Sequence, residues 1–167
     1  MPKPLEVTLP SEREVRVTRT FNAPRTLVWD AHTKPELIQK WMLGPPGWSM
    51  PVCEMDVRKN GKYRWRWRND SSGKEFGFHG TFEDVKAPSR IAHDQYFDPG
   101  DVGGSMPAND PAQITLELSE SGGVTTLVST MRFVSKEARD GAVGTGMTDG
   151  MEIGYARLDG MFAGKTA

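Results

Sequence analysis

Residues 135–164 constrain the fold most, because their apolar side chains recur with the period of a helix. At about 100° per residue, these side chains share an arc of roughly 120°, the width of a stripe that faces a core. They are Met147, Met151, Tyr155, Leu158, Met161 and Phe162, and the opposite side carries Asp149, Glu152, Ala156 and Asp159. We predict one long amphipathic helix, capped by Ser135, whose methionine and tyrosine face lies against another layer.

Glycines interrupt this helix, and each one inside a helix costs about 1 kcal/mol relative to alanine. Gly146, Gly150 and Gly154 are spaced four apart along one edge of the apolar stripe. Two interpretations remain open. The glycines allow another backbone to approach closely, or, together with adaptable methionines, they leave space for a ligand.

Alternating segments before this helix predict an antiparallel sheet. We expect a first strand at 14–21, two short helices within 22–41, and further strands at 52–58, 62–68, 75–86, 90–97, 113–119 and 124–133. Asn60-Gly61 between two alternating stretches is typical of a hairpin. The aromatic face of such a sheet needs a cover. The fold class is therefore α+β: a curved antiparallel sheet of six or seven strands wraps around the terminal helix, with two short helices between strands 1 and 2.

The 167 residues are expected to form one domain, 1–167, with residues 1–12 as a flexible N-terminal segment. Residues 98–112 are rich in Gly, Pro and Asp and have no periodicity, which predicts a functional loop or a disordered one. Together with residues 44–50, they are candidate loops at the mouth of a site.

Composition excludes several classes of partner. The net charge of −1 argues against nucleic acid. No apolar stretch has the length of a membrane span, and residues 1–11 have no signal-peptide core. The single Cys53 fits a reducing compartment. We expect a cytoplasmic protein, monomeric or homodimeric, that contacts neither nucleic acid nor membrane.

The order of these elements resembles the helix-grip fold of the START-like or Bet v-like (SRPBCC) superfamily, and within it the family named for activators of the heat-shock protein 90 ATPase. The resemblance covers residues 16–163 and is carried by FNAP at 21–24, VW at 28–29, PEL at 35–37, VRKNGKY at 57–63, FHGTF at 78–82 and GMTDGM at 146–151. It implies a cavity between the sheet and the C-terminal helix. Members of the superfamily bind lipids, hormones or polyketides, a few catalyse cyclisation or ring chemistry, and the eukaryotic members of the family are co-chaperones.

A small-molecule site needs apolar and aromatic walls with a few fixed polar groups. The candidate wall residues are Tyr63, Trp65, Trp67, Phe76 and Phe78 from the sheet and Met147, Met151 and Tyr155 from the helix. His93 and Gln95 share the parity of Ile91 and Phe97, so they are predicted to face inward. Unpaired, each would cost a few kcal/mol. They bond each other, water, Tyr155 or a ligand, or the parity is off by one and both face solvent.

No metal or cofactor is expected, because His32, His79 and His93 lack ligand spacing and Cys53 has no cysteine companion. The favoured function is the binding of a small hydrophobic or aromatic molecule. One alternative is a cyclase-like or hydrolase-like enzyme in which His93 and Tyr155 are the acid–base groups. Another is a co-chaperone-like interaction module that uses the basic strand face formed by Lys62, Arg64, Arg66 and Arg68, which is otherwise a solvated surface.

Overall fold

The computed structural model describes residues 4–98 and 111–163, and in this part of the chain eight antiparallel strands form one sheet that carries helices on one face. The elements follow one another as β1 (Glu6–Thr8), β2 (Glu14–Phe21), α1 (Arg25–Thr33), α2 (Pro35–Trp41), β3 (Trp48–Met55), β4 (Lys62–Asn69), β5 (Glu75–Lys86), β6 (Arg90–Asp98), β7 (Ala112–Ser121), β8 (Val124–Arg132), α3 (Lys136–Gly144) and α4 (Met147–Ala163). The strand order is β1-β2-β8-β7-β6-β5-β4-β3.

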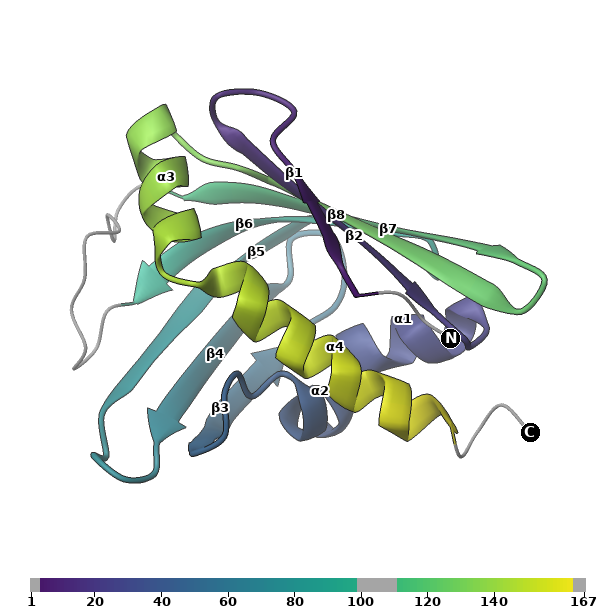
Figure 1. The fold of residues 1–167 in the computed structure, drawn as a ribbon, viewed down its shortest axis with the longest axis horizontal. Coiled ribbons are helices and arrows are strands. Elements are labelled where there is room, and N and C mark those ends of the chain that lie inside the picture. Colours follow the sequence, from purple (N-terminus) through teal and green to yellow (C-terminus); the bar gives the residue numbers. More distant parts are fainter. Residues whose placement is uncertain (1–3, 99–110, 164–167) are drawn as a thin grey trace.

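The arrangement confirms the predicted α+β fold. Figure 1 shows α4 crossing one face of the curved sheet diagonally, with α3 at one end and α1 and α2 beside the other. The two short helices follow β2, whose bounds agree with the predicted first strand. The inward residues of the central strands form the core, and Val15, Val17 and Leu127 are each 0% exposed. The apolar residues that alternate in the sequence are therefore the residues that alternate between buried and exposed positions along the strands.

The two edge strands differ most from the prediction. Residues 6–8, within the segment expected to be flexible, form β1 and pair with β2, with Val7 opposite Val17. Three residues are too few for a period-two pattern to be recognised. At the other edge β3 begins at Trp48, inside the predicted mouth loop 44–50, and an irregularity in its register between Ser49 and Val52 accommodates Pro51. Of the predicted loop 98–112, residues 99–110 lie outside the described residues.

The prediction of one long terminal helix is wrong, because the chain forms α3 and α4 with a break at residues 145–146. Gly146 has a φ of +81°, which a non-glycine residue rarely adopts. The predicted start is confirmed, since the Ser135 hydroxyl accepts a hydrogen bond from the Ala138 amide at 3.0 Å. The break separates the direction of α4 from that of α3, so α4 alone covers the sheet face.

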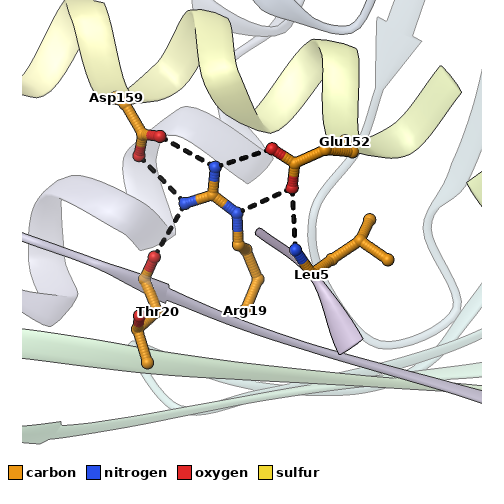
Figure 2. A network of polar contacts seen from close by, with 5 residues as sticks. All are labelled: Leu5, Arg19, Thr20, Glu152 and Asp159. Atoms are coloured by element: carbon orange, nitrogen blue, oxygen red, sulfur yellow. Dashed lines mark hydrogen bonds and ion pairs between the residues drawn. The ribbon is translucent and has the colours of Figure 1, made fainter. Parts of the chain in front are cut away.

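A buried arginine joins α4 to the sheet, as Figure 2 shows. Arg19 of β2 is 3% exposed, and its guanidinium lies 3.0 Å from Glu152 and 2.8 Å from Asp159, both on α4. It also donates to the Thr20 carbonyl at 2.9 Å, and the Leu5 amide donates to Glu152 at 2.8 Å. Glu152 and Asp159 had been predicted to project away from the sheet. They lie instead on the flank of the apolar stripe, within reach of a long side chain on β2.

Burial alone would lower the pKa of Arg19, but the hydrogen bonds that it donates to Glu152 and Asp159 outweigh this effect and raise that pKa above its ordinary value. Burial likewise would raise the pKa of Glu152, yet the bonds from Arg19 and the Leu5 amide lower it below the usual 4.5. Arg19 and Glu152 are therefore an ion pair at neutral pH, and together with Asp159 they form a clamp between β2 and α4.

Arg19→Met should lower the free energy of unfolding by about 2–3 kcal/mol at pH 7, because it leaves two carboxylates facing each other without a cation. Chemical denaturation measures this. The stability that Glu152 contributes is present above pH 4.5 and is lost as the pH falls through its lowered folded-state pKa, so the deficit should shrink near pH 3. Lys136→Met, which breaks an exposed pair with Asp140 on α3, is the control and should cost less than about 1 kcal/mol. Equal losses in the two variants would contradict the clamp.

The glycines spaced four apart at 146, 150 and 154 lie in different environments. A Cβ at Gly154 would lie 3.1 Å from the Trp41 carbonyl oxygen and 3.2 Å from its indole ring, whereas a Cβ at Gly150 would meet nothing within 4 Å. Close approach thus explains Gly154, where α4 meets α2.

Gly154→Val should destabilise the protein by about 1–3 kcal/mol, because the added methyl groups push α4 away from Trp41. Gly150→Ala should stabilise it by up to about 1 kcal/mol through helix propensity. Thermal unfolding of both variants provides the comparison. A stable Gly154→Val protein would show that the contact at Trp41 is loose.

Candidate functional site

The inner faces of β4, β5 and β6 carry most of the predicted wall residues. Antiparallel register places Trp65 opposite Phe78 and Trp67 opposite Phe76, while Tyr63 lies opposite Gly80. His93 of β6 lies opposite Phe82 of β5. The period-two pattern therefore does bring these side chains to the face that α4 covers.

Five rings gather at the edge of the sheet where β4 and β6 end and where β3 and β5 begin. We call them the aromatic end cluster: Trp48, Trp67, Phe76, Phe78 and Phe97. Trp67 stacks on Phe76 with centroids 5.5 Å apart, and Phe78 lies 5.6 Å from Phe97. Trp48 contacts Phe76 edge-on at 5.4 Å. The Trp67 indole nitrogen donates to the Met42 carbonyl at 2.6 Å, which ties the cluster to the segment after α2. All of these rings except Phe97 remain partly exposed.

His93 lies in a second group, nearer the core. Its Nδ1 is 2.9 Å from the Asp94 carbonyl oxygen and 3.0 Å from the Tyr63 hydroxyl oxygen. The Tyr63 hydroxyl donates to the same carbonyl at 2.7 Å. The rings of Tyr63 and His93 meet edge-on, with centroids 4.9 Å apart. His93 is thus paired with Tyr63 and a backbone carbonyl, and within the described residues neither Gln95 nor Tyr155 is its partner.

Gly80 makes this pairing possible, because Tyr63 must cross β5 to reach β6. A Cβ at Gly80 would collide with the Asp94 carbonyl oxygen and would lie 2.9 Å from the Tyr63 ring. The glycine within the FHGTF motif therefore has a structural reason: only a residue without a side chain leaves room for the tyrosine.

The imidazole of His93 and the phenol of Tyr63 are both neutral near pH 7. Burial lowers the pKa of His93 below 6.5, although the bond to the Asp94 carbonyl and the nearby Asp94 charge act in the other direction. Burial also raises the pKa of Tyr63 above its ordinary value, with a smaller contribution from Asp94. The site can donate and accept hydrogen bonds, but it does not present a charge to a ligand.

The three predicted wall residues of α4 lie in two different environments. Met147 and Met151 are partly buried and pack against the core together with Trp65. Tyr155 is only 3% exposed and packs among other rings, 5.5 Å from Phe21 and 5.7 Å from Trp41. The structure therefore places Tyr155 with α1 and α2. Within the described residues, no hydrogen bond or ring contact joins Tyr155 to His93, the candidate acid–base group.

Gln95 faces the same side as His93, opposite Ala112, and is partly exposed. The sequence pattern does not mark Trp48, which lies within the predicted mouth loop 44–50 but belongs to β3, or the Asp94 carbonyl. On the outer face Arg66 is 3.0 Å from Glu75 and 2.5 Å from Asp98. One member of the predicted basic strand face is therefore already neutralised.

Metal ligands do not gather in the part of the chain that the structure describes: no group of three or more His, Cys, Asp or Glu residues could hold an ion there. Burial raises the pKa of the Cys53 thiol to about 12, with a smaller effect of Glu36. A thiol that stays protonated is a poor nucleophile. Among the described helices, none combines the length and apolarity needed to cross a bilayer.

An eight-stranded antiparallel sheet with an inner aromatic face, closed by a C-terminal helix, defines an α+β domain of the helix-grip type. The chain belongs to the family described as Activator of Hsp90 ATPase homolog 1-like protein, whose family model matches residues 22–163. This confirms the resemblance seen in the sequence. No curated protein matches the chain.

Solved structures agree with this assignment. A crystal structure from Rhodobacter sphaeroides is similar with a TM-score of 0.83 and 26% identity, covering 96% of this chain and 98% of the other. A solution structure from Staphylococcus epidermidis has a TM-score of 0.75 and 28% identity, with coverage of 94% and 93%. Protein Ms6760 from Mycobacterium smegmatis, at 19% identity, a TM-score of 0.79 and coverage of 96% of both chains, shares the fold.

The free energy of unfolding should decrease as the pH is lowered from about 6.5 toward 4. Burial lowers the pKa of His93, and it lowers the pKa of His32 to about 4. In this pH range the unfolded chain therefore binds protons that the folded protein does not bind, which favours unfolding. His93→Gln should reduce this slope by up to about 1.4 kcal/mol per pH unit. Urea titrations at several pH values test this, and an unchanged slope would contradict the neutral buried histidine.

Proposed function

We propose that this protein binds a small, neutral, hydrophobic or aromatic molecule between the inner face of β4–β6 and α4. The observation that carries the proposal is uneven burial of one continuous face. The side chains of β2 and β8 under the helix are fully buried, whereas four rings on β4 and β5 and two methionines on α4 keep partial exposure although they face the interior. These are Trp65, Trp67, Phe76, Phe78, Met147 and Met151.

Large apolar side chains that face inward and remain incompletely covered are a natural surface for an apolar guest. Burying such surface contributes about 25 cal/mol per Å², so a two-ring molecule gains several kcal/mol. Unbranched methionines adapt to guests of different shape. The membership of the chain in its family is consistent with this use of the fold.

The polar groups favour a neutral guest. Arg19 is the buried cation under α4, and its N–H groups are engaged by Glu152 and Asp159. His93 is kept uncharged by burial. An anionic ligand would therefore lose its hydration without meeting an unpaired cation among the described inward residues.

A panel of neutral two-ring aromatic compounds should raise the melting temperature by roughly 5 °C or more at concentrations far above the dissociation constant. Met151→Arg should remove this shift, because it places a long charged side chain on the apolar, partly buried face of α4. Ile153→Arg is the matched control: it lies on the same helix at an exposed position, 36% exposed, and should keep the shift. A flat response of the unaltered protein across the panel would overturn the proposal.

A further inference from the structure

The ring nitrogens of His93 have different roles, and the geometry fixes them. Nδ1 lies 2.9 Å from the backbone carbonyl oxygen of Asp94, and a carbonyl oxygen only accepts hydrogen bonds. Nδ1 therefore carries the proton. In the neutral ring the other nitrogen, Nε2, then has no proton and can only accept.

Tyr63 does not change this assignment. Its hydroxyl proton is directed to the same Asp94 carbonyl, at 2.7 Å, so the hydroxyl oxygen is left to accept a share of the Nδ1 proton at 3.0 Å. One carbonyl, one hydroxyl and one ring nitrogen are satisfied together. The arrangement holds the imidazole in a single tautomer and orientation.

His93 Nε2 has no hydrogen-bond partner among the described residues. The residue is 7% exposed, and its ring neighbours present mostly carbon: Tyr63, Phe82 at 5.9 Å and Trp65 at 6.2 Å between centroids. Ile114 of β7 lies opposite it on the other side. Nε2 is not one of the fully buried atoms without a partner, unlike the indole nitrogen of Trp65, so a bound molecule can reach it.

The same neighbourhood holds an unpaired donor. The indole Nε1 of Trp65 is buried and has no hydrogen-bond partner. An acceptor and a donor, each without a partner, lie on adjoining rings of one face. A hydroxyl group both donates and accepts, whereas an ether only accepts and a hydrocarbon does neither.

We propose that His93 Nε2 accepts a hydrogen bond from a hydroxyl group of the bound molecule, so that the ligand class is a neutral hydroxylated aromatic compound, such as a phenol or an enol. This rests on the proposed function, because it assigns the orientation of a guest in the same site. The aromatic rings hold the body of the ligand, and His93 selects for its hydroxyl.

The probes are 2-naphthol and 2-methoxynaphthalene, which differ by one methyl group on the oxygen, and isothermal calorimetry measures their affinities. The unaltered protein should bind the naphthol about ten-fold more tightly, the value of one buried hydrogen bond. His93→Phe should bring the ratio near one while the ether still binds. Tyr63→Phe should keep the preference, since Nδ1 retains the Asp94 carbonyl.

The outcomes separate the two proposals. If neither compound binds, the proposed function fails and the inference falls with it. If the ether binds and the naphthol binds no more tightly, or if His93→Phe keeps the preference, only the role of His93 is overturned. Should His93→Phe fail to fold, ¹⁵N NMR of the unaltered protein decides: the Nε2 resonance must shift with the naphthol and stay unchanged with the ether.

Discussion

The ion pairs of Arg19 are the interaction on which the position of α4 depends. A guanidinium on the inner face of β2 is costly to bury, and it is tolerated because two carboxylates of one helix meet it from two directions. The bond from the Leu5 amide to Glu152 adds the N-terminal segment and β1 to the same clamp. An apolar face alone would let a helix slide along a sheet, whereas planar hydrogen bonds to a guanidinium fix its register.

The two halves of α4 are unequally buried. Gly154, Tyr155, Leu158 and Phe162 are its buried residues, and all lie beyond the first turns. Trp41 closes this half from the side of α2, in contact with Gly154 and stacked on Tyr155. The first turns, which carry Met147 and Met151, follow the break at Gly146 and stay partly exposed. The first half of α4 is thus the less buried half, and the ligand site that we propose lies on this side of the helix.

Local patterns predicted what depends on local geometry. Alternation assigned Tyr63, Trp65, Trp67 and His93 to the inner face, because successive side chains of a strand point to opposite sides. Contacts between residues far apart in the sequence could not be predicted from these patterns. Arg19 is separated from Glu152 and Asp159 by 133 and 140 residues, and nothing near Arg19 in the sequence marks it as buried. The break in the terminal helix was missed for another reason. Several glycines weaken the helix equally, and only the three-dimensional path selects Gly146 as the one with positive φ.

Alternation places His93 on the inner face, but the pairing of β5 with β6 beyond it contains an irregularity that a period-two pattern does not reveal. The register of β5 against β6 shifts between Phe82 and Asp84, so one extra residue on β5 changes which side chains face inward beyond that point. Such a bulge bends a strand, and the bend allows the sheet to curve toward α4. It also sets His93 opposite Phe82, with Gly80 one alternation further along, where the hydroxyl of Tyr63 can cross to β6. The tautomer of the histidine, and hence the one acceptor it offers, is set by the bond of Nδ1 to the Asp94 carbonyl, close to this bulge.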